Sequence, residues 1–143
     1  MSGAETSRAE IAATGGCLCG AVRYEVRGSL TPVSCCHCSQ CRRATGHFLA
    51  STSTPRKSLR LIRETGLRWY QSSKRARRGF CGVCGSTLFW DGQDFDIISI
   101  AAGTLDSPTG LAIGRHIFTA NKGDYYEIDD GAAQYPQWPD MPG

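Results

Sequence analysis

Hydrophobic and polar residues alternate in short runs along most of this chain. In the segment Ala21–Arg27 every second position is hydrophobic, namely Val22, Tyr24 and Val26. A period of two residues is typical of a strand with one buried face. Gly28 follows directly and indicates a turn. The segment is therefore predicted to be a half-buried β-strand.

Further short runs of this kind follow, separated by clusters of Gly, Pro, Ser and Asp. The additional strand candidates are Pro32–Cys36, Phe48–Thr52, Ser58–Arg63, Leu67–Gln71, Arg77–Phe80, Thr87–Trp90, Asp96–Ala101, His116–Thr119 and Tyr125–Ile128. Many short strands between turn signals favour antiparallel sheets. We expect a mostly β fold, with small antiparallel sheets forming a single domain.

Helical signal is confined to Ser39–Thr45, about one and a half turns followed by Gly46, which favours a left-handed helix stop. A length of 143 residues suits one domain. We predict a flexible N-terminal segment at 1–14, a β domain at 15–130 and a tail at 131–143. The three prolines of the tail favour a surface position.

The chain has eight cysteines, and their chemical state depends on the cellular compartment of the protein. The N-terminus carries acids and lacks the apolar core of a signal peptide, and no apolar run approaches the roughly 20 residues that cross a bilayer. These features predict a cytoplasmic protein without a membrane partner. Cytosolic thiols are kept reduced, so the cysteines are predicted to be metal ligands or catalytic groups rather than disulfides.

Four cysteines form two close pairs that are remote from each other in sequence. Cys17 and Cys19 lie in G-G-C-L-C-G, and Cys81 and Cys84 lie in F-C-G-V-C-G-S. Two such knuckles can be joined by one tetrahedral zinc ion, which supplies folding free energy. A C-x-x-C pair can also be a redox centre, but that function requires a strand followed by a helix. Cys84 instead leads into the predicted strand Thr87–Trp90, so a structural zinc site is favoured.

Three further cysteines, Cys36, Cys38 and Cys41, form a C-x-C-x-x-C cluster at the predicted helix. Three sulfurs within six residues can bind one face of an ion and leave its fourth position to water or substrate. Such an open position distinguishes a catalytic zinc site from a structural one. The alternative is a fourth protein ligand, for which the candidates are Cys35, His37, His47 and His116.

Strand geometry argues against the nearest of these candidates. Cys35 and Cys36 are consecutive in an extended segment, so their side chains should point to opposite faces. The same reasoning applies to His37, which stands between two ligands. We interpret Cys35 as a small buried apolar residue. Isolated histidines among strands are commonly structural, which leaves His47 and His116 as the remaining candidates.

These residues together resemble a known family. The chain resembles the glutathione-dependent formaldehyde-activating enzymes, and the related domain of centromere protein V, over about residues 15–130. The resemblance is carried by G-G-C-L-C-G at 15–20, C-H-C-S-Q-C-R-R-A-T-G at 36–46, F-C-G-V-C-G-S-T-L-F at 80–89, and the later segments A-A-G-T-L-D and H-I-F-T. It implies a β-rich domain with a structural zinc on the four-cysteine set and a catalytic zinc on the three-cysteine set.

The activity implied by the resemblance is a carbon–sulfur lyase reaction that reversibly joins glutathione and formaldehyde. A glutathione thiol in the open position would be held as a thiolate, which is the nucleophilic form, and its attack on the aldehyde gives a hemithioacetal. Three thiolates on Zn²⁺ leave a net charge of −1, which favours activation of sulfur over hydrolysis. The expected partners are a small thiol such as glutathione and a small aldehyde.

Charge is distributed unevenly along the chain. From Arg42 to Arg78 there are eleven Lys or Arg residues against the single acid Glu64, although the formal net charge is only +3. Seven metal-bound thiolates and two zinc ions change that net charge to about 0. Arg42 and Arg43 adjoin the three-cysteine cluster and are predicted to offset thiolate charge or to bind glutathione's carboxylates. The same role is open to the basic residues that precede Cys81, which are Lys74, Arg75, Arg77 and Arg78. The alternative is a solvated basic face.

Two competing functions remain open at the level of sequence. The first is a non-catalytic zinc module that binds a protein or nucleic acid through the basic stretch Arg42–Arg78. Few aromatic residues alternate with the Lys and Arg residues of this stretch, which argues against stacking on the bases of a nucleic acid. The second is a thiol redox or metal-sensing protein that uses Cys35. The sequence does not indicate an oligomeric state.

Overall fold

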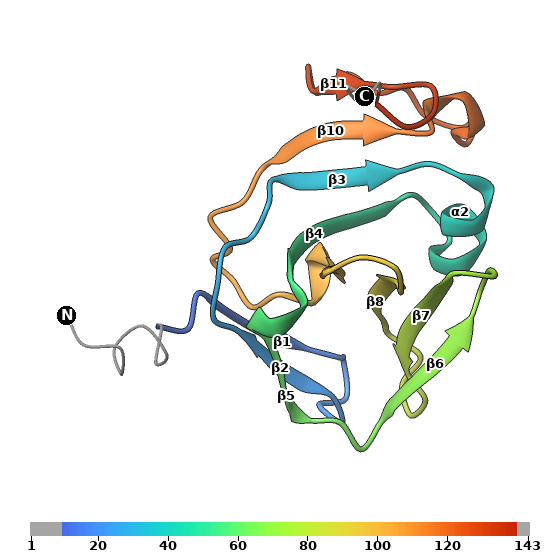
Figure 1. The fold of residues 1–143 in the computed structure, drawn as a ribbon. Coiled ribbons are helices and arrows are strands. Elements are labelled where there is room, and N and C mark those ends of the chain that lie inside the picture. Colours follow the sequence, from blue (N-terminus) through green and yellow to red (C-terminus); the bar gives the residue numbers. More distant parts are fainter. Residues whose placement is uncertain (1–9, 140–143) are drawn as a thin grey trace.

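The computed structural model describes residues 10–139, which form two β-sheets and one short α-helix (Figure 1). The small sheet has the strand order β1-β2-β5, with bounds Ala13–Gly16, Arg23–Val26 and Leu59–Arg63. The large sheet has the order β11-β10-β3-β4-β9-β8-β7-β6. The prediction of a small, mostly β single domain with little helix is confirmed.

The remaining elements connect or form the large sheet. Its strands are β3 (Val33–Cys36), β4 (Leu49–Pro55), β6 (Leu67–Gln71), β7 (Ala76–Cys81), β8 (Thr87–Gly92), β9 (Ile97–Ala101), β10 (Ile113–Ile117) and β11 (Ala133–Gln134). The helix α2 (Ser39–Thr45) joins β3 to β4, and three single 3-10 turns are η1 (Arg56–Ser58), η2 (Ala102–Thr104) and η3 (Thr119–Asn121). No helix in residues 10–139 is long and apolar enough to cross a membrane.

Most neighbouring strands pair antiparallel, but the end of the chain departs from that pattern. After η2 the chain returns to the far side of the large sheet, where β10 pairs parallel with β3 and β11 pairs parallel with β10. Figure 1 shows β10 and β3 running side by side toward α2. This return brings the end of the chain next to the segment that carries Cys36, and so helps to build the site.

Two segments differ from the sequence-based expectations. The prediction of a strand at Tyr125–Ile128 is wrong, because this segment is a loop whose two tyrosine rings pack against histidines. The strand β1 was not predicted, since A-T-G-G has no hydrophobic alternation. It begins at Ala13, inside the segment expected to be flexible; residues 1–9 and 140–143 lie outside the described residues.

The hydrophobic core lies between the two sheets. It contains Val22, Tyr24 and Val26 from the small sheet and Leu88, Phe89, Ile98 and Ile100 from the large one. The Tyr24 ring meets the edge of Phe89 at a centroid distance of 5.4 Å, and its hydroxyl bonds to the Thr104 Oγ1 atom at 2.7 Å. Gly79 lies between the rings of Trp69 and Phe89, where a Cβ would come within 3.0 Å of both. Any larger residue would have to push these rings apart, so the core packing favours glycine at this position.

The opposite face of the large sheet is polar, and we call it the serine face. Cross-strand pairing places these residues on it: Ser34, Ser51, Ser53, Ser99, Trp90, Arg78 and Arg115. Cys36 lies on the same face because it follows Ser34 by two residues, whereas Cys35 points toward the buried side. Because successive side chains of β3 point to opposite faces of the sheet, Cys35 and Cys36 lie on different sides of it.

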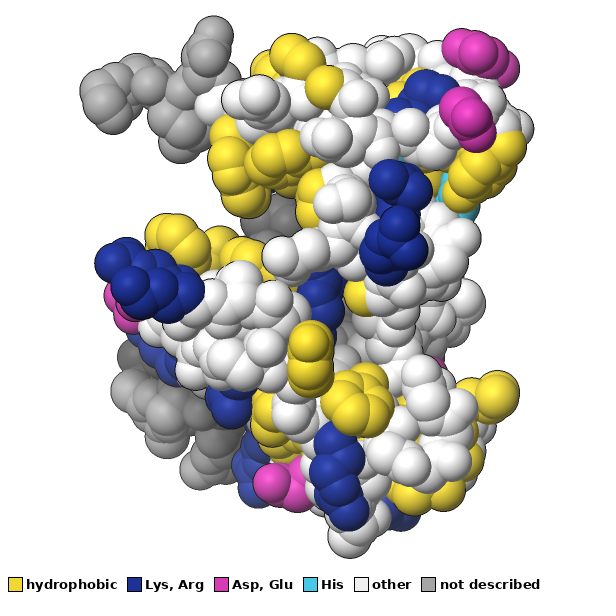
Figure 2. Space-filling view, turned by 90° about the vertical axis from the view of Figure 1, so that its right-hand side faces the viewer, with side chains coloured by type: hydrophobic (Ala, Val, Ile, Leu, Met, Phe, Trp, Pro, Cys, Tyr) yellow, Lys and Arg dark blue, Asp and Glu magenta, His cyan; other side chains and the backbone are white. Residues whose placement is uncertain are grey.

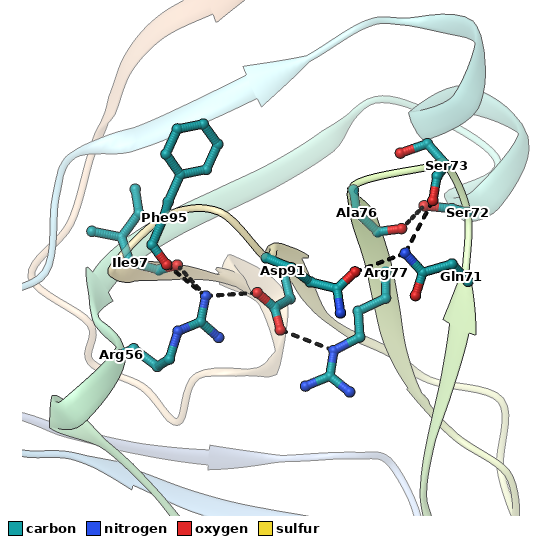
Figure 3. A network of polar contacts seen from close by, with 10 residues as sticks. Arg56, Gln71, Ser72, Ser73, Ala76, Arg77, Asp91, Phe95 and Ile97 are labelled. Atoms are coloured by element: carbon teal, nitrogen blue, oxygen red, sulfur yellow. Dashed lines mark hydrogen bonds and ion pairs between the residues drawn. The ribbon is translucent and has the colours of Figure 1, made fainter.

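One buried acid joins the large sheet to the turn after β4. Asp91 is 1% exposed and accepts bonds from Arg56 Nη2 at 2.7 Å and Arg77 Nε at 2.9 Å (Figure 3). Arg77 also stacks on Trp69, with its Cζ atom 3.9 Å from the ring centroid. Burial opposes ionisation of Asp91, but the two guanidinium groups outweigh it and lower the pKa of this carboxyl.

We expect Asp91→Asn to lower the free energy of unfolding by about 2–3 kcal/mol, because it leaves two partly buried guanidinium groups without a counter-charge. This is below the cost for a fully buried pair because the side chains of Arg56 and Arg77 are 40% and 34% exposed. Urea denaturation measures the change. The matched control is Asp94→Asn, which removes the exposed Arg75–Asp94 pair and should cost less than about 1 kcal/mol. Equal losses would contradict the assignment.

Candidate functional site

Four cysteines from both sheets meet at one point. Cys17 and Cys19 lie in the turn between β1 and β2, Cys81 ends β7, and Cys84 lies in the turn before β8. Their four sulfur atoms lie within 4.8 Å of one another, with Cys17–Cys19 at 3.7 Å and Cys19–Cys81 at 3.8 Å. A tetrahedral ion with metal–sulfur bonds of about 2.3 Å places sulfurs about 3.8 Å apart. The spacing therefore fits a zinc-sized ion that joins the two sheets.

Backbone amides in both turns point at these sulfurs. The Val22 amide donates to Cys17 Sγ at 3.2 Å, and the Val83 amide donates to Cys81 Sγ at 3.4 Å. Bonds from backbone N–H groups stabilise thiolates and hence metal ligands. The Ser86 hydroxyl and amide lower the pKa of Cys84 to about 5. The turns are thus arranged to hold negative sulfur.

The second cluster forms where β3 leads into α2. Cys36 ends β3, Cys38 is the N-cap of α2 and accepts the Cys41 amide at 3.3 Å, and Cys41 lies in the helix. Gly46 ends the helix with a φ of 87°, which permits the abrupt turn into β4. The three sulfurs lie within 4.8 Å of one another. The residues that the sequence grouped as a three-cysteine set are therefore brought together.

The local charge of this cluster favours metal binding. Bonds from the thiols of Cys36 and Cys41 lower the pKa of Cys38 to about 2, whereas the neighbouring sulfurs raise the pKa of Cys36. The cluster thus holds one thiolate readily and resists further ionisation unless a cation is present. Cys41 is buried, whereas Cys36 and Cys38 remain partly open to solvent. An ion here would be reached from the side of Cys36 and Cys38.

Within residues 10–139 no histidine, cysteine or carboxylate side chain joins these three sulfurs as a fourth ligand. Cys35 is fully buried on the other side of β3, and its burial, together with the charge of Asp130, raises the pKa of its thiol to about 12. His37 and His116 engage both ring nitrogens in other contacts, and His47 bonds through Nδ1 to the Tyr125 hydroxyl. None of the four residues considered as a closing ligand lies in the cluster.

A buried chain of side chains lies behind the cluster. His116 Nε2 bonds to Asp130 Oδ2 at 2.8 Å, His116 Nδ1 to His37 Nε2 at 2.9 Å, and His37 Nδ1 to the Tyr126 hydroxyl. When His116 carries its single proton on Nε2, facing the carboxylate, His37 Nε2 donates to His116 Nδ1 and His37 Nδ1 accepts from the Tyr126 hydroxyl. Burial, reinforced by the positive charge of neighbouring groups, lowers the pKa of His37 to about 4. His37 is therefore neutral at pH 7 and serves as a fixed structural group.

The loop after η3 reaches the cluster through aromatic contacts. The Tyr125 hydroxyl bonds to His47 Nδ1 at 2.6 Å, and the Tyr126 ring stacks on His37 at a centroid distance of 5.8 Å. The Lys122 Nζ atom donates to the Tyr126 carbonyl at 2.5 Å. These contacts fix the loop against the segment that carries Cys36 and Cys38. The sequence carried no local signal for this packing, because the partners lie about 80 residues apart.

The sequence places Arg78 among the basic residues before Cys81 that could offset thiolate charge, and the structure shows that the sulfur it contacts is that of Cys41. Arg78 is 9% exposed, and its Nη2 atom donates to Cys41 Sγ at 3.5 Å. Arg42, which was predicted to bind substrate, instead donates from Nε to the Asn121 carbonyl at 2.9 Å, and Arg43 is exposed. Figure 2 shows Lys and Arg side chains along a hollow on the side of the molecule that α2 faces. The cation in contact with the cysteines thus comes from β7.

Comparisons with known proteins agree with this arrangement. A family profile described as glutathione-dependent formaldehyde-activating enzyme matches residues 12–121. An uncharacterised lyase of Schizosaccharomyces pombe is 36% identical over 77 residues, which cover 53% of this chain and 55% of that protein. The chain therefore spans about half the length of this curated relative.

A solved structure supports the fold. The crystal structure of a Rhodobacter sphaeroides protein superimposes with a TM-score of 0.58 at 22% identity, covering 85% of this chain and 98% of the other. The profile match covers most of the chain and includes all seven clustered cysteines. The chain belongs to the family of the glutathione-dependent formaldehyde-activating enzymes.

Proposed function

We propose that this protein is a zinc-dependent carbon–sulfur lyase that reversibly joins glutathione, or a similar thiol, to formaldehyde or another small aldehyde. The observation that carries the proposal is the cluster of Cys36, Cys38 and Cys41, which lacks a fourth ligand among residues 10–139. Membership of the family and the lyase name of the Schizosaccharomyces pombe relative support the reaction class.

The seven clustered cysteines fit two zinc ions, one structural and one catalytic. Cys17, Cys19, Cys81 and Cys84 would enclose a structural ion, because four thiolates complete a tetrahedral shell. Cys36, Cys38 and Cys41 would hold a catalytic ion. When bound there, zinc supplies Lewis acidity that keeps an incoming thiol in its nucleophilic thiolate form at neutral pH.

The protein's own contribution is charge balance and orientation. Arg78 places a buried cation against Cys41, which offsets the negative charge of the thiolate set. The chain Asp130–His116–His37 fixes the backbone between Cys36 and Cys38 from behind. Neither belongs to the three-cysteine set, so we assign to both the role of holding that set in one geometry.

Proton transfer in the proposed reaction balances without a protein base. The thiol loses one proton, its sulfur forms a bond to the aldehyde carbon, and the carbonyl oxygen gains one proton. His37 and His116 point away from Cys36 and have both ring nitrogens engaged. We therefore propose that this proton exchanges with water. A cytoplasmic location is proposed with it, because a half-exposed thiol cluster requires a reducing compartment.

Exchange NMR tests the proposal directly, since thiol, aldehyde and hemithioacetal interconvert at equilibrium. The zinc-loaded protein at micromolar concentration is expected to accelerate exchange between glutathione and its formaldehyde adduct above the uncatalysed rate. Cys38→Ser should remove the acceleration, whereas the control Cys35→Ala should retain it, because Cys35 lies outside the cluster. The absence of acceleration by fully loaded wild-type protein would reject the function. Loss in Cys35→Ala alone would favour a redox role.

A further inference from the structure

A separate pocket opens on the serine face at the starts of β3 and β10. It has a volume of about 390 Å³, and its lining includes Thr31, Pro32, Ser34, Ser53, Ile97 and Arg115. Small-molecule sites commonly measure roughly 300–1,000 Å³, are mostly apolar and contain a few convergent polar groups. Here Pro32 and Ile97 supply apolar edges, while Ser34, Ser53 and Arg115 supply the polar groups.

The pocket and the three-cysteine cluster share one face of the sheet. Ser34 precedes Cys36 by two residues on β3, so their side chains point the same way with Cα atoms about 7 Å apart. Arg115 pairs with Ser34 across the parallel strand β10. In Figure 1 both strands run from the pocket end toward α2, where the cysteines lie. A molecule about 7–8 Å long therefore spans both places.

Arg115 is oriented but not neutralised. Its Nε atom donates to Ser34 Oγ at 3.0 Å, which is its one hydrogen bond among the described residues. Arg77, also on the large sheet, differs in this respect, because its guanidinium pairs with the carboxylate of Asp91. No acid of residues 10–139 forms an ion pair with Arg115, although its guanidinium is only partly exposed. A planar group with both Nη atoms available is suited to a carboxylate.

We propose that this pocket binds a carboxylate of the thiol substrate, with Arg115 as the specificity-determining residue. The inference rests on the proposed function and narrows its substrate class to peptide-like thiols whose carboxylate lies about 7–8 Å from the sulfur site. One residue of extended chain spans at most about 3.6 Å, so a cysteinyl di- or tripeptide reaches from the cysteine cluster to Arg115. A short neutral thiol reaches only the cysteines. Arg42 and Arg43 have no part in this recognition.

Calorimetric titration of the zinc-loaded protein tests the pocket with two probes, glutathione and its diethyl ester, which lacks both carboxylate charges. Arg115→Gln is expected to raise the Kd for glutathione about 10–100-fold, as loss of a hydrogen bond to a charged group does. The same variant should bind the diester as the wild type does. Arg115→Lys retains the charge and should recover part of the affinity. Circular dichroism verifies that each variant is folded.

Arg43→Gln is the matched control, because it removes an exposed arginine next to the cysteine cluster. It should change the Kd for glutathione less than about threefold, as expected for a solvated charge. Equal affinity of wild type and Arg115→Gln for glutathione would overturn the proposal. A larger loss in Arg43→Gln than in Arg115→Gln would also overturn it, in favour of a carboxylate site on α2.

A third probe separates failure of the pocket from failure of the proposed function. S-methylglutathione keeps the carboxylates but lacks a free thiol. It is expected to shift the amide NMR signals of Ser34 and Arg115 in the wild type, and not to do so in Arg115→Gln. If these shifts appear while no thiol is turned over, the carboxylate site is supported and the lyase function is rejected. If thiol exchange is accelerated and these shifts are absent, the carboxylate site is rejected and the lyase function is retained.

Discussion

Replacement of Cys81 by serine is expected to unfold the protein at ordinary temperature, with the loss of one bound metal ion. Cys81 is buried, ends β7 and contributes to the one cluster that joins the small sheet to the large one. Structural zinc sites contribute an apparent free energy of about 10–16 kcal/mol, which is comparable with the whole stability of a domain. Thermal denaturation followed by circular dichroism, with metal analysis of the same sample, measures both effects.

The control for this substitution is Cys35→Ala, which also changes a buried cysteine but leaves both clusters intact. Removal of a single buried sulfur should cost about 1 kcal/mol and shift the melting temperature by a few degrees. Metal content should remain at its wild-type value. If Cys81→Ser melts as Cys35→Ala does, the four-cysteine cluster is not a structural clamp.

Replacement of Cys36 by alanine is expected to have the opposite profile, with the fold retained and the proposed activity lost. Cys36, Cys38 and Cys41 all lie within one β3–α2 segment, so an ion bound there joins no distant parts of the chain. We expect the melting temperature to fall by only a few degrees and the metal content to fall by one ion per chain. Thiol–aldehyde exchange should fall at least about 100-fold, toward the uncatalysed rate.

Global unfolding of Cys36→Ala would contradict the division of labour between the two clusters. So would retention of both the second ion and the exchange activity, because a fourth ligand would then have to hold the ion. Zinc analysis after dialysis and the exchange measurement on the same preparation distinguish these outcomes. The variants Cys36→Ala and Cys81→Ser each remove one sulfur from one cluster, so the difference between them reports the difference between the clusters.

The parts of the fold that depend on local sequence could be predicted. The helix α2 was expected at Ser39–Thr45 and is found there, because Gly46 provides a left-handed stop. The strand β6 likewise has its expected bounds. The opposite orientation of Cys35 and Cys36 followed from the two-residue period of a strand, and the structure has it. These features need only neighbours along the chain.

The parts that depend on tertiary contacts could not be predicted. Tyr125 and Tyr126 have the composition of a strand, but their rings find partners on His37 and His47, and the segment stays a loop. Arg42 and Arg43 are adjacent to Cys41 in sequence, yet successive helical residues point about 100° apart, away from the preceding ligand. The cation that reaches Cys41 is Arg78, on a strand 37 residues away. The sequence indicated Arg78 as a possible counter-charge because it lies near Cys81, but only the fold shows that it contacts Cys41.

The environments of the basic residues also depend on tertiary contacts and could not be predicted from the sequence. The run from Arg42 to Arg78 suggested one basic surface, but its members have different environments in the fold. Arg56 and Arg77 bind the buried Asp91, Arg78 contacts Cys41, and Arg75 pairs with Asp94 at the surface. The pocket arginine, Arg115, lies outside that run altogether. Clustering along the sequence therefore does not produce clustering in space in a β fold.

X-ray absorption at the zinc edge of the purified protein, before and after addition of glutathione, determines whether the three-cysteine site is open to a thiol. We expect two zinc ions per chain with an average of about 3.5 sulfur ligands per ion, since one site has four cysteines and the other has three. Glutathione should raise that average to about 4 by adding one sulfur to the three-cysteine site. Two four-sulfur sites that do not change on addition of the thiol would contradict this expectation.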